Sequence, residues 1–479
     1  MAALACLVLV FAVAGCRGTQ PRTPVQEPIP DQPPEPSGQE PVVEEPAEPV
    51  LTIDETYEAI ALSVQAGDPD GAIAAYQEAE LENPDDPATR VLLANLYLIA
   101  GAIDEAQALL DELLSADPRN TDALFLSSLV AAATGDRDRQ RAILEEVLEL
   151  DPTNAKALAS LGEIQLQNRQ FIAAADSFSN ALVQDENNLV ARMGLANVYL
   201  REEEYEAAET ELTTVINSDP DYPYSYADRA RARAMQYELG GAAADLSVAI
   251  ELDPDYQWHF IDRGRVYLEL GRYAEAEADF STALELNDGQ FITHILRGRA
   301  RDALANEEGA ISDYESGLRL RPDYYPAYAP YATLRYLSGE NTEAAAFYQQ
   351  AFEADERRLE YIFMAALALN TAGDKPAADA WINQNLSKIP RESVYYQMAR
   401  YYLLPTNEGY VMAEISAEEN TALRGQMYFY LGAYLALVER HATATAALLE
   451  AEELLPPRTL ERRLATRHLA VYRDQEEGD

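Results

Sequence analysis

From residue 53 onward, apolar side chains recur along the chain at a fixed interval of 34 residues. A small residue marks each interval, at Ala72, Ala106, Ala174, Ala208, Ala242, Ala276, Ala310, Ala344 and Ala378, and only Gln140 departs from this series. A large apolar side chain follows four residues later, at Tyr76, Leu110, Leu144, Phe178, Leu212, Leu246, Phe280, Tyr314, Tyr348 and Ile382. Spacings of three and four residues place side chains on one face of a helix, so the pattern predicts α-helices.

Two further sets of positions divide these helices into units. Twelve residues after the alanine position comes a proline, at Pro84, Pro118, Pro152, Pro220, Pro254, Pro322 and Pro390. Twelve residues before it comes a second small residue, such as Gly162 or Gly264, which lets two helices approach closely. Because proline cannot continue a helix, each unit ends there and is a helix hairpin. A hairpin that cannot bury its own apolar face must stack on its neighbours.

The period, the alanine, the large apolar residue and the proline together resemble the tetratricopeptide repeat (TPR) over residues 53–390. The resemblance implies an all-α fold, a right-handed α-solenoid of about ten 34-residue hairpins. It also implies that the first helices line a concave groove for extended peptides or partner helices, and that the repeats catalyse no reaction. Residues 391–424 leave the register, so we interpret 391–475 as a divergent, TPR-like C-terminal region that ends in an Arg-rich capping helix.

The first 50 residues differ from the repeats. Residues 1–15 carry no charged side chain, and their roughly fourteen apolar residues suit a signal peptide, whereas a spanning helix needs about twenty. They end in Val13-Ala14-Gly15-Cys16, which resembles the lipobox of bacterial lipoproteins and implies lipidation of Cys16. The alternative is an ordinary secretory signal. Residues 16–50 are rich in Pro and Glu, a composition that predicts an extended, disordered tether.

Charge and composition exclude several kinds of function. The chain has 82 Asp and Glu against 36 Lys and Arg, a formal net charge of −46. Such a surplus repels phosphate backbones and anionic lipids, so we expect no nucleic-acid partner and membrane contact through the lipid anchor only. The two cysteines lie in the first sixteen residues and the four histidines are scattered. We therefore expect no metal site, no cofactor, no catalytic residue and no enzymatic activity.

Three consecutive repeats share an arginine and an aspartate that the other repeats lack. Arg229, Arg263 and Arg297 precede the small position, and Asp245, Asp279 and Asp313 follow sixteen residues later. Because the two substitutions occur only together, we predict structural ion pairs between the two helices of each hairpin: Arg229–Asp245, Arg263–Asp279 and Arg297–Asp313. Removing one partner of such a pair would leave a partly buried charge.

A second arginine follows two residues later in the same repeats, at Arg231, Arg265 and Arg299. In the TPR family this position faces the groove, so the resemblance implies a row of cations there. Since arginine binds carboxylates bidentately, we hypothesise a site for an acidic peptide or a C-terminus. Asn95 and Asn197 hold the same position and favour a peptide over a polysaccharide. The alternative is that the neighbouring Asp228 and Asp262 neutralise the arginines.

Together these patterns predict a scaffold of the bacterial cell envelope that binds carboxylate-bearing proteins or peptides. We expect it on the periplasmic face, at the outer membrane, because Arg17 replaces the Asp that retains some lipoproteins at the inner membrane. Two alternatives stay open: an assembly factor for an outer-membrane machine of the secretin-pilot or β-barrel-assembly type, and a scaffold for envelope polysaccharide export. The segment Phe429-Tyr430-Leu431-Gly432 and the end layout are more loosely similar to the new-lipoprotein-I family of TPR adaptors, which tether envelope enzymes.

Overall fold

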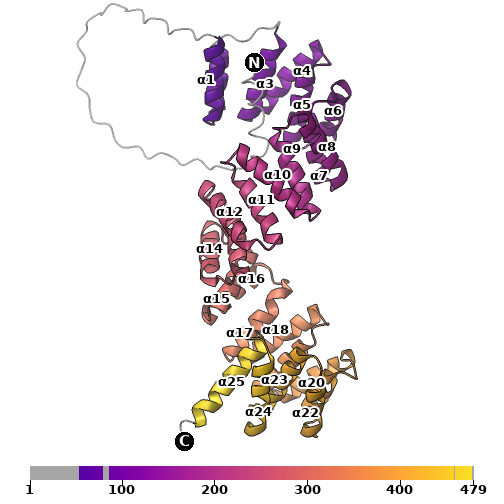
Figure 1. Cartoon of the computed structure of the whole chain (residues 1–479), viewed down its shortest axis with the longest axis vertical. Helices are drawn as coiled ribbons and strands as arrows, with labels where there is room; N and C mark the ends of the chain where they lie inside the picture. Colours follow the sequence, from indigo (N-terminus) through magenta and orange to yellow (C-terminus); the bar gives the residue numbers. More distant parts are fainter. Residues whose placement is uncertain (1–52, 79–85, 458, 477–479) are drawn as a thin grey trace, which may run out of the picture. The chain divides into compact units, whose positions relative to one another are not determined.

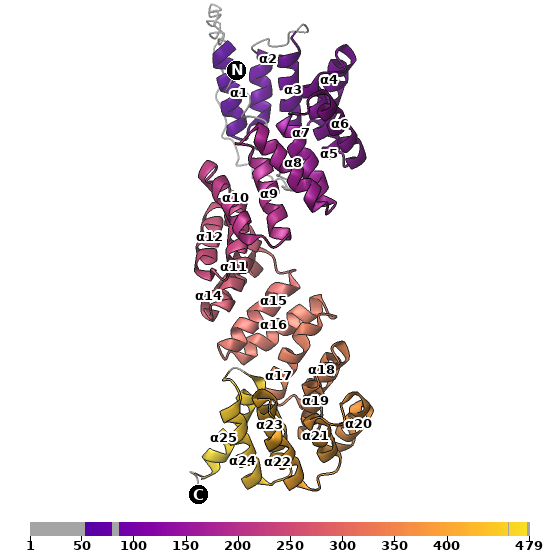
Figure 2. The same cartoon turned by 45° about the vertical axis from the view of Figure 1, so that its right-hand side comes forward.

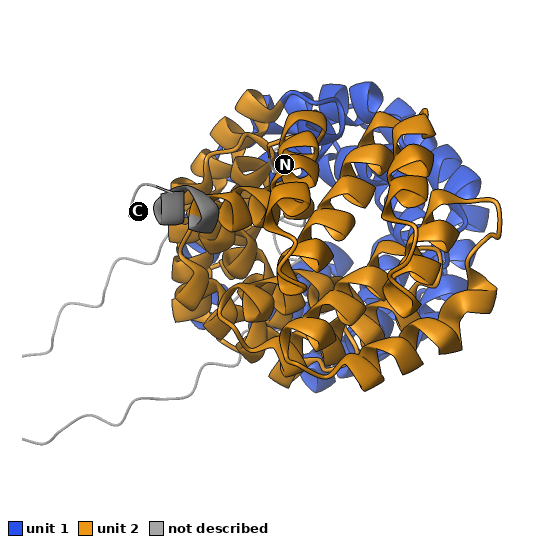
Figure 3. Ribbon diagram, turned by 90° about the horizontal axis from the view of Figure 1, so that it is seen from below, with its two compact units in different colours: residues 1–238 blue, residues 239–479 orange. Residues whose placement is uncertain are grey.

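The structure of the protein is a computed structural model that describes residues 53–78, 86–457 and 459–476. These residues form α-helices and two short 3-10 helices, and no strand occurs among them. The predicted signal peptide, Cys16 and the tether lie outside the described residues. The chain divides into two compact units, residues 1–238 and residues 239–479, which Figure 3 shows in blue and orange.

In unit 1 the helices follow one another as antiparallel hairpins (Figure 1). They are α1 (Ile53–Gln65), α2 (Pro69–Glu78), α3 (Pro87–Ala100), α4 (Ile103–Ala116), α5 (Thr121–Ala133), α6 (Arg137–Leu150), α7 (Ala155–Gln167), α8 (Phe171–Gln184), α9 (Leu189–Arg201), α10 (Tyr205–Ser218) and α11 (Pro223–Met235).

Unit 2 continues the series and ends in a single helix (Figure 2). Its helices are α12 (Leu239–Leu252), α13 (Gln257–Glu269), α14 (Tyr273–Leu286), α15 (Phe291–Ala303), α16 (Glu307–Leu320), η1 (Tyr325–Ala327), α17 (Tyr328–Leu337), α18 (Asn341–Ala354), α19 (Glu360–Thr371), α20 (Lys375–Asn385), η2 (Leu386–Lys388), α21 (Val394–Leu403), α22 (Glu408–Ala417), α23 (Thr421–Leu437), α24 (His441–Leu454) and α25 (Leu460–Glu476).

The periodic positions of the sequence form the core of the hairpins. Each alanine of the series is 0% exposed, and each large side chain four residues later is at most 2% exposed. The small residues make room for them: a Cβ added to Gly162 would lie 2.7 Å from Cε1 of Phe178, and one added to Gly194 would lie closer still to the same ring. The expected all-α fold of stacked helix hairpins is confirmed within each unit.

The starts of several first helices are fixed by asparagine caps. The backbone N–H of Ala123 donates to Oδ1 of Asn120 at 2.9 Å. The same bond recurs 34 residues later at Asn154 and again at Asn188. Each cap satisfies a backbone donor that the first turn of a helix leaves without a partner. The interval of 34 residues is therefore built into the helix ends as well as into the core.

A residue with positive φ marks the turn inside each hairpin. Such residues follow the 34-residue interval without a gap at Gly67, Gly101, Gly135, Arg169, Glu203, Tyr237, Gly271, Ala305, Gly339, Gly373 and Asn407. Glycine adopts this backbone conformation freely, whereas other residues do so against steric resistance. In the region 391–424, where we predicted a break of register, the turn residue Asn407 keeps the interval, but α21 ends at Leu403 and α22 begins directly after Asn407, unlike the helices of the other hairpins. The turn residue itself shifts at the next hairpin, to Glu439.

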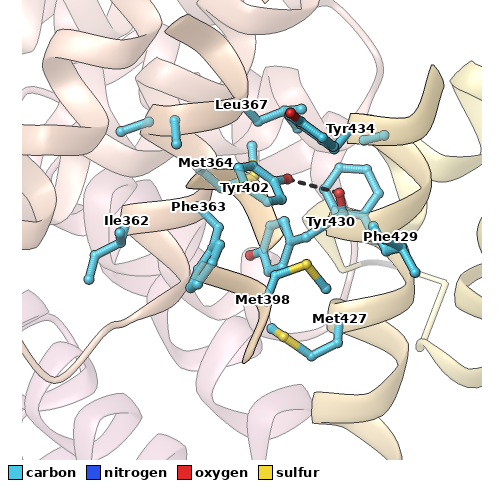
Figure 4. Close-up of a cluster of buried hydrophobic side chains, with 14 of the residues drawn as sticks. Ile362, Phe363, Met364, Leu367, Met398, Tyr402, Met427, Phe429, Tyr430 and Tyr434 are labelled. Atoms are coloured by element: carbon cyan, nitrogen blue, oxygen red, sulfur yellow. Dashed lines mark hydrogen bonds between the residues drawn. The ribbon is translucent and has the colours of Figure 1, made fainter. Parts of the chain in front are cut away.

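Aromatic side chains join the irregular hairpins to the regular ones in unit 2 (Figure 4). The ring centroids of Phe363 on α19 and Tyr430 on α23 lie 5.4 Å apart, and those of Tyr402 on α21 and Tyr434 on α23 lie 4.5 Å apart. The hydroxyl of Tyr402 donates to the backbone carbonyl of Tyr430 at 2.8 Å. The C-terminal region thus shares one core with the preceding repeats, α17 to α20.

Candidate binding surface

Two of the predicted arginine–aspartate pairs lie inside hairpins of unit 2. Arg263 on α13 donates from Nη2 to Oδ1 of Asp279 at 2.7 Å and from Nε to Oδ2 at 2.9 Å. Arg297 on α15 holds Asp313 in the same way, with Nη2 2.7 Å from Oδ1. Both aspartates are buried, at 6% and 2% exposure. Arg229 belongs to unit 1 and Asp245 to unit 2, so their pair stays a prediction.

The same arginines also reach back to the preceding hairpin. The Nη1 atoms of Arg229, Arg263 and Arg297 donate to the hydroxyls of Thr213, Ser247 and Ser281, at 3.2, 3.0 and 3.3 Å. Each hydroxyl stands sixteen residues before its arginine, on the second helix of the previous hairpin. This link was not predicted from the sequence, although the hydroxyl recurs at the 34-residue interval. These arginines therefore join hairpins to one another and serve as structural residues.

Asp313 has further partners besides its arginine in the hairpin. Besides Arg297, Arg301 donates from Nη1 to Oδ2 at 2.9 Å, and Nδ1 of His294 lies 3.7 Å from Oδ1. Burial acts to raise the pKa of Asp313, but the approach of His294, the hydrogen bonds from Arg297 and the charges of Arg297 and Arg301 outweigh it. The pKa of Asp313 consequently lies below its usual value.

The predicted row of groove arginines is only partly neutralised. Arg231, in unit 1, is 56% exposed at its side chain and lies 2.8 Å from Oδ1 of Asp228. Arg265, in unit 2, is 50% exposed and 4.0 Å from Oδ1 of Asp262, the limit of an ion pair. Arg299 is exposed, and no carboxylate of a described residue lies within 4.0 Å of it. Within unit 2, then, Arg265 and Arg299 offer guanidinium groups to solvent.

The two asparagines at the same repeat position are less open. Asn95 is 7% exposed. Asn197 donates from Nδ2 to the carbonyl of Met193 on its own helix at 3.1 Å. A partner-binding role for either residue stays a prediction.

The repeat position that these residues share defines what we call the first-helix face. In unit 1 it consists of Asn95, Leu129, Glu163, Asn197 and Arg231 on α3, α5, α7, α9 and α11, and in unit 2 it contains Arg265, Arg299 and Thr333 on α13, α15 and α17. Two of its stretches are hollowed, one in each unit.

The hollow of unit 1 has a volume of about 270 Å³ and lies among α5, α6, α7 and the start of α9. Phe125, Leu129 and Ile164 give it apolar walls, and Arg137, Gln140 and Lys156 give it polar ones. This site was not predicted from the sequence. Its one signal was Gln140, which breaks the alanine series and lines the hollow.

Glu163 is an acidic residue of this hollow with a shifted pKa. Burial raises the pKa of its carboxyl, and no opposing charge lowers it. Arg137 and Lys156 line the same hollow, but neither forms an ion pair with Glu163 or with another carboxylate among the described residues. A carboxyl group, two cations and apolar walls in one place suit a ligand with both apolar and hydrogen-bonding groups, as a polypeptide segment has.

The hollow of unit 2 has a volume of about 400 Å³ and lies under the C-terminal helix α25. Asp302 and Thr333 line it from α15 and α17, and Glu360 and Tyr361 line it from α19. Glu461 and Arg463 of α25 cover its other side. Arg358 pairs with Glu360, and Arg463 pairs with Asp302. Glu461 accepts hydrogen bonds from Gln426 and Tyr430, so the charged side chains of this hollow already have partners.

Neither a metal centre nor a membrane span is found in the described parts of the chain. Across residues 53–78, 86–457 and 459–476, no three His, Cys, Asp or Glu side chains are grouped so that they would hold a metal ion. Over the same ranges, no helix has the length and apolar character needed to cross a bilayer.

Comparison with known proteins gives matches to repeats and to one longer protein. Sequence profiles described as tetratricopeptide repeat match residues 63–132 and 165–234, 121–154, and 260–289. A stretch of 71 residues is 45% identical to the "Cellulose synthase operon protein C" of Pseudomonas fluorescens (strain SBW25). That match covers 15% of this chain and only 6% of the length of the relative.

Solved structures of similar repeat proteins were also found. YrrB, described as a TPR protein with an unusual peptide-binding site, is 18% identical, with 40% of this chain and 97% of that chain covered and a TM-score of 0.35. A tetratricopeptide repeat protein from Parabacteroides merdae is 20% identical, with 52% and 98% covered and a TM-score of 0.36. PilF of Pseudomonas aeruginosa is 17% identical, with 43% and 95% covered and a TM-score of 0.39.

Proposed function

The chain is a tetratricopeptide repeat protein, and we propose that it is a non-catalytic scaffold which binds a partner polypeptide on its first-helix face. The observation that carries this proposal is the hollow of unit 1, where the groove positions Leu129 and Glu163 line a cavity of about 270 Å³. It combines apolar walls with charged groups that have no ion-pair partner among the described residues. Such surfaces are typical of binding sites that orient a ligand by a few polar contacts.

The chemistry of the first-helix face favours a carboxylate-bearing partner. Arg137 and Lys156 stand at the hollow of unit 1, and Arg265 and Arg299 stand on the face of unit 2. In a chain of net charge −46, these cations are the groups that would attract an acidic segment and fix its register. An apolar side chain of the partner would lie against Phe125 and Leu129.

The test is capture of partners by cross-linking in the membrane fraction with Lys156→Glu and Leu129→Glu variants. The matched control is Arg139→Glu, which makes the same charge reversal as Lys156→Glu at an exposed position of α6 that does not line the hollow. We expect one or more protein partners to be lost in both hollow variants and kept in the control. Identical partner sets in all three proteins, with unchanged helicity and melting, would contradict the proposal.

We further propose that Cys16 carries a lipid that holds the scaffold on the periplasmic face of the outer membrane. The support is the sequence Val13-Ala14-Gly15-Cys16 at the end of an apolar segment, followed by a Pro- and Glu-rich stretch suited to a tether. The test is metabolic labelling with an alkyne-bearing fatty acid. The Cys16→Ser variant should lose both the label and sedimentation with membranes, and a label kept by this variant would contradict the anchor.

A second candidate function is a scaffold for envelope polysaccharide export. It is favoured by the 45% identity over 71 residues to a protein named for a cellulose synthase operon. A polymer-binding groove needs aromatic platforms, and the first-helix face of unit 1 has none at its repeat position. Binding of cello-oligosaccharides, measured by calorimetry, would favour this candidate.

If the captured partner proves to be a component of a secretin or a β-barrel machine, the scaffold would instead be an assembly factor.

A further inference from the structure

Helix α25 makes a contact that a repeat array does not normally have. In such arrays each hairpin touches only its neighbours in the chain. Here Arg463 of α25 donates from Nη1 to both carboxylate oxygens of Asp302 on α15, at 3.0 and 3.1 Å. The two residues are 161 positions apart. One side chain therefore ties the last helix of unit 2 to a much earlier hairpin of the same unit.

One side of α25 is fixed to the last hairpin. Leu464, Ala465 and Leu469 are at most 2% exposed and belong to the aromatic core of the C-terminal region. Glu461 is 5% exposed and accepts hydrogen bonds from Nε2 of Gln426 at 3.0 Å and from the hydroxyl of Tyr430 at 3.1 Å, both on α23. Figures 1 and 2 show α25 in yellow beside α23 and α24. This side of the helix is a cap that burial holds in place.

Ion pairs join the other side of α25 to α15 and α16. Nη2 of Arg463 lies 3.8 Å from Oε1 of Glu307, and Nη1 of Arg467 lies 3.7 Å from Oε2 of the same residue. Arg463 is 32% exposed and Asp302 is 24% exposed at their side chains, so water and salt reach this contact. Ion pairs of this kind contribute little to stability and are easily exchanged. The contact is well suited to open and close, with α25 and the last hairpin moving together relative to α15 and α16.

The same contact lies at the hollow of unit 2. Asp302 of α15 and Arg463 of α25 both line the 400 Å³ hollow, together with Thr333 and Tyr361. Thr333 holds the next position of the first-helix face after Arg299. A segment that follows this face from Arg299 to Thr333 therefore comes to the hollow that Asp302 and Arg463 also line.

We propose that Arg463 and Asp302 form a gate across the first-helix face of unit 2, and that a carboxylate-bearing segment of a partner opens it by taking Arg463 from Asp302. The identity of the ligand class rests on the proposed function, whereas the gate itself rests on the geometry of α25. The incoming carboxylate has further cations at hand, because Arg299 stands one helical turn from Asp302 and Arg358 lines the same hollow. The acidic groups of the hollow accept from protein donors, as Glu360 does from Arg358 and Glu461 from Tyr430, which favours an anionic ligand over a cationic one.

The gate is tested in the full chain by measuring one distance. Cys6 and Cys16 are replaced by serine, and spin labels are placed on Glu308→Cys of α16 and Ala470→Cys of α25, both exposed. At low salt the label distance should be short and narrowly distributed. In about 1 M NaCl, where the screening length falls to about 3 Å, and in Arg463→Gln, the distribution should lengthen and broaden. Arg462→Gln is the matched control, because Arg462 donates to the carbonyl of Leu455 and not to α15.

The ligand is tested with a twelve-residue glutamate peptide as the probe. At low salt the peptide should lengthen the label distance in the wild type, and its affinity should fall at least tenfold in Arg299→Gln and in Arg463→Gln. A dodecalysine peptide should leave the distance unchanged. No response to the glutamate peptide would overturn the carboxylate as the opening ligand.

An unchanged distribution in salt and in Arg463→Gln, with helicity and melting preserved, would overturn the gate and make α25 a fixed cap. That outcome is distinguishable from failure of the proposed function, because the latter is tested at the hollow of unit 1.

Discussion

Arg297 and Asp313 face each other across the α15–α16 hairpin, with Nη2 2.7 Å from Oδ1 and Nε 3.0 Å from Oδ2. These two hydrogen bonds make the pair bidentate. Because Asp313 is only 2% exposed, its carboxylate is almost fully shielded from water. Arg301 and His294 approach the same carboxylate. This concentration of donors makes Asp313 a stability-determining residue of the middle repeats.

Arg297→Ala should leave the buried carboxylate of Asp313 short of its main partner. We expect the free energy of unfolding of this part of unit 2 to fall by about 3 kcal/mol. Hydrogen exchange of the α15 and α16 amides measures the loss locally, which matters because a repeat array need not unfold in one step. Arg299→Ala, two residues away and exposed, is the control and should change stability by less than about 0.5 kcal/mol. Equal losses in the two variants would contradict the structural role of the pair.

The stability of the same hairpin should depend on pH through Asp313. Because the pKa of Asp313 is lower in the folded protein than in the unfolded chain, its contribution is fully present above the unfolded pKa and is lost as pH falls through the folded pKa. The cations Arg297 and Arg301 and the titratable ring of His294 face it. Asp313→Asn should remove this acid-side loss from the pH profile of unfolding. A profile unchanged by the substitution would show that other carboxylates set the acid limit.

Gly194→Ala should destabilise unit 1 by overpacking. A Cβ at this position meets the ring of Phe178, which is 0% exposed and also faces Gly162 from α7. The alanine gains about 1 kcal/mol of helix propensity but forces the ring to move, a change that typically costs about 1–3 kcal/mol. Urea denaturation measures the net loss. Combining Gly194→Ala with Phe178→Leu should cost less than the sum of the two single changes, and strict additivity would argue against the close contact.

Glu163→Gln should stabilise unit 1 at neutral pH. The raised pKa of Glu163 means that its folded-state contribution is present below the unfolded pKa and is lost as pH rises through the folded pKa. The amide of the Glu163→Gln variant does not ionise, so the variant does not lose this contribution to stability as pH rises. The wild type and the variant should therefore have similar stability near pH 4 and diverge above it, in thermal melts followed by circular dichroism. A variant that is less stable than the wild type at pH 7 would mean that the ionised carboxyl has a partner.

The groove arginines are tested together by Arg231, Arg265, Arg299→Glu. We expect this variant to lose an acidic partner from cross-linked capture while keeping its helicity and melting temperature, because the three side chains are exposed. Reversal of three charges should also invert the salt dependence of binding. Capture of the same partners by both forms would exclude these arginines as the docking site.

The features that could be predicted from the sequence are those that recur within single hairpins. The alanine and large apolar series alone indicates the buried positions, and each of them is buried in the structure. The pairs Arg263–Asp279 and Arg297–Asp313 follow from substitutions that occur only together, and both pairs are present. These contacts join residues at a constant separation, so a pattern along the chain is sufficient to find them.

Contacts between hairpins were harder to foresee. The bonds from Arg263 and Arg297 to Ser247 and Ser281 depend on how one hairpin sits on the previous one. The hollow of unit 1 needs side chains from four helices, and of these only Gln140 stands out in the sequence. The reach of Arg463 to Asp302 depends on the path of the whole C-terminal region. No local rule of spacing carries that information.

The residues of positive φ at the hairpin turns have a consequence for engineering this chain. Arg169, Glu203 and Ala305 adopt at their turns the backbone conformation that glycine adopts at the equivalent turns of other hairpins. This conformation costs a residue other than glycine about 1–2 kcal/mol. Glycine would remove that cost, although part of the gain in stability would be lost because glycine increases the conformational entropy of the unfolded chain. Glycine at these three sites would leave the first-helix face untouched. Thermal stability could thus be raised at turns that lie outside the proposed binding face.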